Sequence, residues 1–167
     1  MKRAEFWREH LQLVRHPEGG WFRETWRTAE SFPFSDGSTF TSPRSCATAI
    51  YYLLEAGDRS ALHRIRSEEL WLWHAGDPLK VSVFPGGEGT PSSFTLGPDL
   101  QNGNKLQGVV AAGDWFGAAA PSRGRSGYTL VSCVVAPGFE FRDFSFAKRD
   151  ELTARFPLHR AIIENLT

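Results

Sequence analysis

The stretch that decides the fold is GDRSALHRIRSEELWLWHAG (residues 57–76). It contains two runs with the composition of β-strands, SALHRI (60–65) and ELWLWHA (69–75), and the second run ends at the turn Gly76-Asp77. Short strand-like runs that are bounded by turn residues are typical of antiparallel hairpins. The stretch therefore predicts a hairpin at the centre of an all-β protein.

Similar short runs lie on both sides of this hairpin. They cover residues 21–27, 46–54, 80–84, 92–96, 105–110, 127–135 and 139–146. Strands at this spacing, joined by tight turns, indicate a sandwich or a closed barrel rather than alternating strands and helices. Residues 28–44 are rich in Ser, Thr, Pro and Gly, and we expect them to form an exposed loop.

Two helices are expected at the ends of the chain. Residues 3–14 carry apolar side chains at helical spacing, and residues 148–166 carry a second apolar stripe that is interrupted at Pro157. We expect the second helix to pack on the outside of the barrel. A chain of 167 residues suits one domain, so we predict a single domain over 1–167 with its barrel at about 20–146.

The composition narrows the classes of partner. Lys and Arg together number 19, as do Asp and Glu, which gives no electrostatic reason to expect a nucleic acid or an anionic membrane. No stretch approaches the roughly 20 apolar residues of a membrane-spanning helix, and the N-terminus lacks the apolar core of a secretory signal. Cys46 and Cys133 are not spaced for a zinc knuckle and are expected to be reduced thiols. We expect a cytoplasmic protein.

The hairpin also carries the candidate chemistry. Strand alternation places His63 and Ile65 on one face, and Glu69, Trp71 and Trp73 share a face of the next strand. If the two faces meet, an imidazole, a carboxylate and two indoles lie at one mouth of the barrel. A buried imidazole beside a carboxylate is suited to acid–base catalysis, and indole faces can stack on a flat ligand.

Further candidates lie on other strands. Arg23 and Glu24 sit on opposite faces of the first strand, so one of them should point into the mouth. Tyr128 is the best phenol for an acid role, whereas alternation aims His74 away from His63. His16 is expected only to shape a turn. The predicted catalytic residues are His63, Glu69 and Tyr128, and the predicted ligand-binding residues are Trp21, Arg23, Glu24, Trp71, Trp73, Trp115 and Phe116.

The spacing of Gly57, His63, Glu69 and Gly76 resembles the first motif of the cupins, G-x5-H-x-H-x3-E-x6-G. The second cupin motif is matched at Gly113 only. Metal-binding cupins hold a divalent transition metal with three histidines and the glutamate. Here Ile65 stands in place of the second histidine and Phe116 in place of the third. Two ligands rarely hold a catalytic metal, so we predict no metal and no other cofactor.

The chain is similar over nearly its whole length to a cupin subfamily of unassigned function, DUF985 or Cupin_5. The matching segments include HPEGGWFRET (16–25), AIYYLL (49–54), LHRI (62–65), ELW (69–71), HAGD (74–77), AGDWF (112–116), SGY (126–128) and VAPGF (135–139). The resemblance implies a jelly-roll barrel of the RmlC type, commonly a homodimer, with a pocket whose reaction is not settled. Its better-understood relatives resemble metal-free deoxysugar-nucleotide epimerases, which use a His base and a Tyr acid.

Three functional hypotheses follow. The first is a metal-independent enzyme that performs epimerase- or isomerase-like proton transfer on a sugar, a sugar nucleotide or a similar polar metabolite, with His63 as base, Glu69 as its partner and Tyr128 as acid. The second is a binding or sensing module that holds a small molecule without chemistry. The third is a metal cupin that completes its ligand set with a non-standard residue such as His74.

Overall fold

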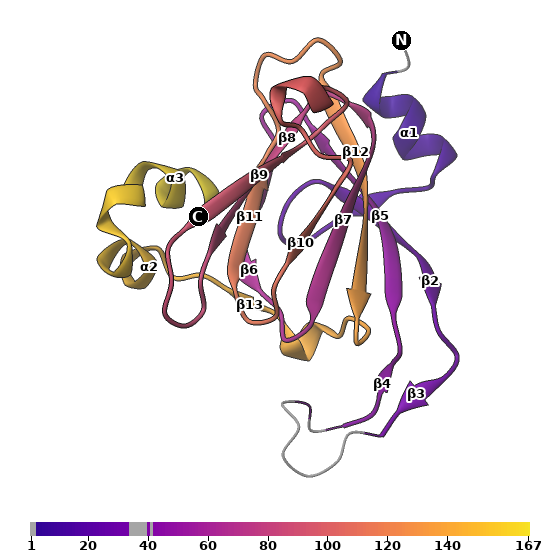
Figure 1. The fold of residues 1–167 in the computed structure, drawn as a ribbon. Helices are drawn as coiled ribbons and strands as arrows, with labels where there is room; N and C mark the ends of the chain where they lie inside the picture. The colour runs from indigo at the N-terminus through magenta and orange to yellow at the C-terminus, as the bar shows by residue number, and fades with distance from the viewer. Residues whose placement is uncertain (1–2, 34–39, 41) are drawn as a thin grey trace.

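The computed structural model describes residues 3–33, 40 and 42–167. Its strands form a six-stranded sheet in the order β1-β2-β5-β12-β7-β10, a five-stranded sheet in the order β13-β6-β11-β8-β9, and the small β3-β4 pair (Figure 1). The bounds are β1 Val14–Arg15, β2 Trp21–Arg27, β3 Ser31–Phe32, β4 Arg44–Ser45, β5 Thr48–Glu55, β6 Arg59–Arg64, β7 Glu68–Gly76, β8 Leu79–Phe84, β9 Ser92–Leu96, β10 Gln107–Val110, β11 Trp115–Ala119, β12 Tyr128–Ala136 and β13 Ser145–Phe146.

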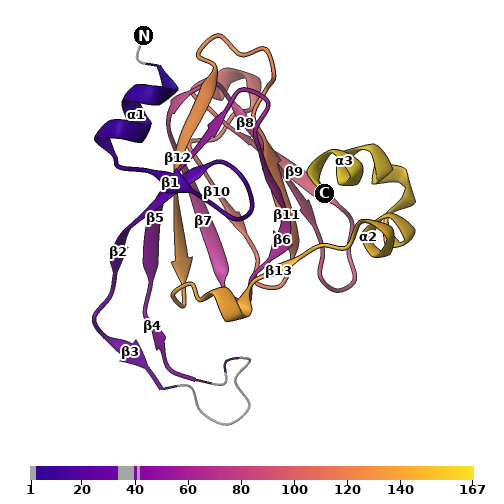
Figure 2. The ribbon, with the colours of Figure 1, turned by 180° about the vertical axis from the view of Figure 1, so that it is seen from behind.

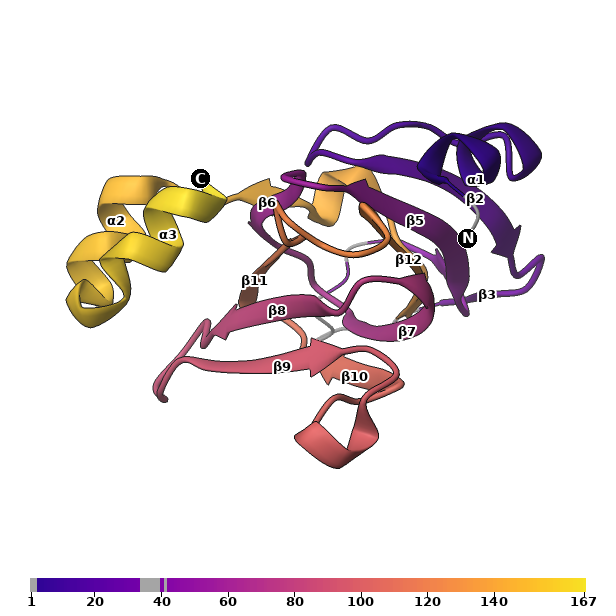
Figure 3. The same cartoon turned by 90° about the horizontal axis from the view of Figure 1, so that it is seen from above.

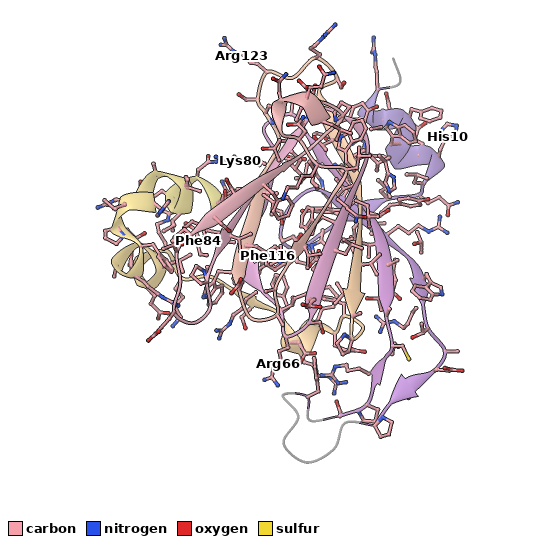
Figure 4. The ribbon with its side chains drawn as sticks, viewed as in Figure 1. His10, Arg66, Lys80, Phe84, Phe116 and Arg123 are labelled. Carbon is pink, nitrogen blue, oxygen red and sulfur yellow. The ribbon has the colours of Figure 1, made fainter. Side chains whose placement is uncertain are left out.

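The two large sheets face each other and hold the main hydrophobic core between them, as the view from above shows (Figure 3). Trp71 of β7 and Phe116 of β11 are both fully buried in this core. Figure 4 shows Phe116 in the interior, whereas the labelled His10 and Arg123 project outward. Alternation along the strands explains the arrangement, because every second side chain of a facing strand points inward. This architecture is the predicted jelly roll, built as a β-sandwich.

Two predicted elements differ in their extent from the sequence-based predictions. Helix α1 covers only Ala4–His10, because Gln12 adopts a positive φ of 53° and the chain then enters β1. The run 139–146 forms a short 3-10 helix, Phe141–Asp143, and the two-residue strand β13 instead of one long strand.

Strand β11 was not predicted from the sequence, because its Gly and Ala residues have low strand propensity. It forms nonetheless between β6 and β8, which pair with it on both sides. Gly117 suits this position, since a Cβ atom there would lie 2.8 Å from the backbone oxygen of Ser60.

The segment predicted as a loop, residues 28–44, contributes the β3-β4 pair, and residues 34–39 and 41 lie outside the described part of the chain. At its end, the guanidinium of Arg44 is buried and contacts both carboxylate oxygens of Asp143 at 2.9 to 3.0 Å. This ion pair ties the β4 segment to the 3-10 helix 99 residues further along the chain.

The C-terminal segment forms α2 (Arg149–Arg155), a 3-10 turn at Pro157–His159 and α3 (Arg160–Leu166). Leu152 and Ile163 pack against Leu62 and Phe84 of the five-stranded sheet. The helices therefore cover that sheet from outside, as predicted, on the side away from α1 (Figure 2). Within the described residues, no helix is long and apolar enough to cross a membrane.

Candidate functional site

A cavity of about 110 Å³ lies between the two sheets. Aromatic rings, including Phe22, Phe139 and Phe141, form part of its wall. Its ionisable lining residues come from β2, β6, β7, β12 and the segments 16–20 and 137–141. They are His16, Glu18, Glu24, Arg27, His63, Glu69, Cys133 and Glu140. Titratable side chains that converge in an enclosed cleft are typical of functional sites, so we take this cavity as the candidate site.

His63 lies on β6 with its ring inside the sandwich and is 2% exposed. The ring stacks on Phe144 at a centroid distance of 4.9 Å and contacts Phe116 at 4.2 Å. Its Nδ1 atom is 2.7 Å from the backbone oxygen of Ala61. Because a carbonyl oxygen only accepts, Nδ1 carries a proton and the ring is held in one orientation.

The carboxylate partner of His63 is Glu18, which the sequence did not single out. Glu18 Oε2 lies 3.2 Å from His63 Nε2, and Ser60 Oγ donates to Glu18 Oε1 at 2.9 Å. Glu18 is itself buried, at 9% exposure. The second ring nitrogen and the carboxyl group are thus neighbours in the cavity wall.

Two glycines bring Glu18 into the sandwich. Gly19 and Gly20 have φ angles of 113° and 68°, which residues other than glycine rarely adopt. A Cβ atom on Gly19 would lie 2.1 Å from the backbone oxygen of Arg59. The segment is further held by Tyr52, whose hydroxyl donates to the Gly19 oxygen at 2.8 Å. The run HPEGG thus forms a loop pressed against β6, and this loop carries Glu18 to His63.

Glu69 lies on β7 and lines the same cavity at 7% exposure. Burial raises its pKa to about 8, and the negative charge of Glu18 contributes to the increase, whereas a hydrogen bond with Cys133 opposes it. Glu69 is therefore mostly a neutral acid at pH 7. Burial also raises the pKa of the Cys133 thiol well above its ordinary value, so this thiol stays protonated.

His16 adds a second imidazole to the lining. Burial lowers its pKa, and the neighbouring Glu18 only partly offsets this effect. The backbone N–H of Glu18 donates to His16 Nδ1 at 3.3 Å, and the ring packs edge-on against Phe22. His16 is thus a neutral member of the site rather than only the turn residue that the sequence predicted.

Three charged residues form a cluster that we call the mouth cluster: Glu24, Arg27 and Glu140. Arg27 donates to Glu24 from Nε at 3.0 Å and from Nη2 at 2.8 Å, and to Glu140 from Nη1 at 3.3 Å. Side-chain exposures of 35 to 39% show that the cluster borders solvent. Of the two alternating residues on β2, it is therefore Glu24 that lines the cavity.

Several predicted residues lie elsewhere. Tyr128 is buried in a separate cluster beside Trp7, outside the cavity lining, so it is not placed to act as an acid on a ligand there. Trp21 belongs to the same cluster and is covered by Arg8 and Arg15. Arg23 points outward and donates to Leu11 and Gln12. These three residues of β2 and β12 were predicted to lie in the pocket. Their side chains instead contact α1 and the residues that directly follow it.

The other predicted aromatics are structural neighbours of the site. The Phe116 ring contacts the His63 ring, and Trp71 packs on Phe116 in the core. Trp73 donates its indole N–H to the Asp77 oxygen at 3.4 Å. Trp115 lies under the Arg64 guanidinium, next to the C-terminal helices. None of the four is part of the cavity lining. His63, Glu69 and Glu24 are the predicted residues that the fold does bring together there.

The ligand set of the metal-binding cupins is not reproduced by the residues present. Ile65 and Phe116 are buried in the core at the positions of two histidine ligands, and neither side chain can donate to a metal. His74 contacts Ser132 at 2.6 Å and is not part of the cavity lining. Across residues 3–33, 40 and 42–167, no group of three His, Cys, Asp or Glu side chains is arranged to hold a metal ion.

Comparison with known proteins places this site within one family. The family model described as Cupin superfamily (DUF985) matches residues 5–147. A solved structure of a hypothetical protein from Leishmania major is 35% identical, covers 99% of both chains and superposes with a TM-score of 0.90. Protein SO0799 from Shewanella oneidensis is 34% identical with a TM-score of 0.84, covering 100% of this chain and 98% of its own.

A curated relative, the uncharacterised protein YML079W of Saccharomyces cerevisiae, is 35% identical in an alignment of 150 residues, which covers 84% of this chain and 74% of the yeast protein. None of these names states an activity. The match over most of the chain agrees with the jelly-roll sandwich and with the cupin motif residues Gly57, His63, Glu69 and Gly76. The protein belongs to the DUF985 family of the cupin superfamily.

Proposed function

We propose that the protein is a metal-independent enzyme that moves protons on a small polar metabolite such as a sugar, in the manner of an epimerase or isomerase. The observation that carries the proposal is the His63–Glu18 pair, at 3.2 Å, in one cavity with a carboxyl group whose pKa is about 8. An imidazole beside a carboxyl group, next to a second carboxyl group that titrates near neutral pH, is a combination suited to general acid–base catalysis.

The roles follow from the contacts. His63 is the imidazole of the cavity and has a carboxyl group beside Nε2, so we assign it the proton donation to a substrate carbonyl. The ionised form of Glu69 accepts the proton from the adjacent carbon. Return of a proton to the intermediate, from Glu69 or from water, gives the isomer, and His63 takes its proton back. Glu18 is a positioning residue that keeps the His63 proton in place.

Turnover should depend on pH through Glu69. Below its pKa of about 8 the fraction of the ionised base falls about tenfold per pH unit, so kcat/KM should rise with pH up to about pH 8. Steady-state assays between pH 5.5 and 9 on a substrate found as described below measure this profile. A rate that is flat across this range would contradict the role of Glu69 as base.

The substrate can be sought by isotope exchange. We expect the protein, incubated with pooled metabolites in D₂O, to place deuterium on carbon in one of them, which mass spectrometry detects. His63→Gln should slow this exchange at least about 100-fold, which is the usual contribution of a positioned acid or base to the rate. Glu18→Gln should act in the same direction.

His74→Gln is the matched control, because His74 contacts Ser132 outside the cavity lining and should leave exchange unchanged. Circular dichroism confirms that each variant is folded. A metabolite that raises the melting temperature but exchanges no proton and yields no product would favour the alternative of a binding or sensing module.

We also propose that the chain forms a homodimer, which is supported by its resemblance to the family. Leu106 and Val109, both more than half exposed beside β7 of the six-stranded sheet, are apolar side chains that a second copy could cover. Light scattering at micromolar concentration should give twice the 18.7 kDa of one chain. A mass of one chain under these conditions would rule the dimer out.

A further inference from the structure

The cavity lining carries more carboxyl groups than basic groups. Among the described residues, Glu18, Glu24, Glu69 and Glu140 face only Arg27 and the two histidines. Whether an anionic ligand can bind depends on whether any of these basic groups is free to meet it.

Four of the five N–H groups of Arg27 already donate to the protein. Its Nε and Nη2 atoms donate to Glu24 and its Nη1 atom donates to Glu140, while Nη2 also donates to the Phe139 oxygen at 3.1 Å. Two carboxylates therefore surround one guanidinium, and the mouth cluster has a net charge of −1. A carboxylate or phosphate that approached Arg27 would lie beside both of these glutamates, whose charges would repel it.

The histidines offer an anion no better partner. His63 faces the Ala61 oxygen at Nδ1 and Glu18 at Nε2, so an anion that approached this ring would lie beside another carboxylate. His16 accepts a hydrogen bond at Nδ1 and is held neutral by burial, which lowers its pKa. The positive charges of the lining are thus already matched by carboxylates of the protein, and an anion would enter an uncompensated, partly desolvated site.

The same lining suits a ligand that donates hydrogen bonds. Carboxyl oxygens of Glu18, Glu24 and Glu140 accept from hydroxyl or ammonium groups, while the rings of Phe22 and Phe139 offer an apolar surface. The cavity volume of about 110 Å³ suits a small ligand with a single ring. This is about the size of one hexose.

We propose that the cavity selects an uncharged or cationic, donor-rich ligand of about hexose size and discriminates against ligands that carry a carboxylate or phosphate. This inference rests on the proposed function and narrows it, because it favours free or amino sugars over sugar nucleotides.

Three hexoses of matched shape and different charge test the proposal. D-glucosamine, D-glucose and D-glucuronate are titrated at pH 6.5 into the full chain, and the side-chain NMR signals of His63 and His16 report binding in the cavity. We expect glucosamine and glucose to bind more tightly than glucuronate, with glucosamine at least about tenfold ahead of glucuronate.

Two results would overturn the inference in distinguishable ways. Glucuronate binding as tightly as glucosamine would overturn the charge selectivity and leave the proposed function standing. If none of the three hexoses moved the His63 and His16 signals at 50 mM, both the ligand class and the sugar-directed proposed function would fail.

A charge variant locates the selectivity. Glu24→Gln with Glu140→Gln changes the mouth cluster from −1 to +1, so the preference for glucosamine over glucuronate should fall at least about tenfold. The control is Glu151→Gln with Glu164→Gln, which also removes two glutamates paired to cations, but on the exposed C-terminal helices. An unchanged ratio in the mouth variant, or an equal change in the control, would overturn the proposal.

Discussion

Glu69→Gln will make the protein about 3 to 5 kcal/mol more stable than the wild type at pH 9 and will leave the two nearly equal at pH 5. In the unfolded chain Glu69 ionises near its ordinary pKa of 4.5, whereas in the folded protein it stays protonated up to about pH 8. Between these values the unfolded state loses a proton that the folded state keeps. Stability is therefore lost as pH rises through this window.

The sign of the effect comes from burial. A raised pKa in a carboxyl group means that the folded state favours the neutral acid, so its contribution is fully present below pH 4.5 and is gone above pH 8. Glutamine has almost the same shape, stays neutral at every pH and escapes this loss.

Urea unfolding of the wild type and the variant at pH 5, 7 and 9 measures the effect. Glu68→Gln is the matched control, because Glu68 precedes Glu69 on β7 but is exposed, and it should follow the wild-type curve. Parallel pH dependence in wild type and Glu69→Gln would show that Glu69 ionises normally, and the proposed role as a base with a raised pKa would fall.

Gly19→Ala will destabilise the protein by about 4 kcal/mol or more and will separate Glu18 from His63. The new Cβ atom would lie 2.1 Å from the Arg59 oxygen, and both groups belong to backbone that cannot rotate away. The loop has to withdraw from β6. The contacts that Glu18 makes with Ser60 and His63 are then lost.

Gly57→Ala is the matched control for this variant. Gly57 also has a positive φ, 82°, but nothing lies within 4 Å of its would-be Cβ atom. Its cost should be only the backbone strain of about 1 to 2 kcal/mol. Urea unfolding gives the two free energies, and the NMR signal of the His63 ring should move in Gly19→Ala but not in Gly57→Ala. Equal losses in the two variants would contradict a close-packed loop.

Much of the fold could be predicted from the sequence, because strand composition and turn residues are local signals. The run WFRETWR became β2 with its predicted bounds, Trp21–Arg27, and the interruption at Pro157 became the break between α2 and α3. Strand β11 escaped prediction because its Gly and Ala residues carry no local preference for a strand. Its neighbours β6 and β8 impose that conformation through hydrogen bonds.

The candidate site, like the fold, could be predicted from the sequence only in part. Sequence alone determined the strand class, the cupin motif and the inward direction of His63 and Glu69, since alternation along a strand needs no knowledge of the rest of the chain. Only the tertiary structure decided that Glu18, from a loop 45 residues before His63, is the carboxylate beside its ring. It also decided that Tyr128 faces another cluster. The physical reason is that contacts between distant segments depend on how sheets pack and where a loop can approach closely, and neither is encoded in the periodicity of one strand.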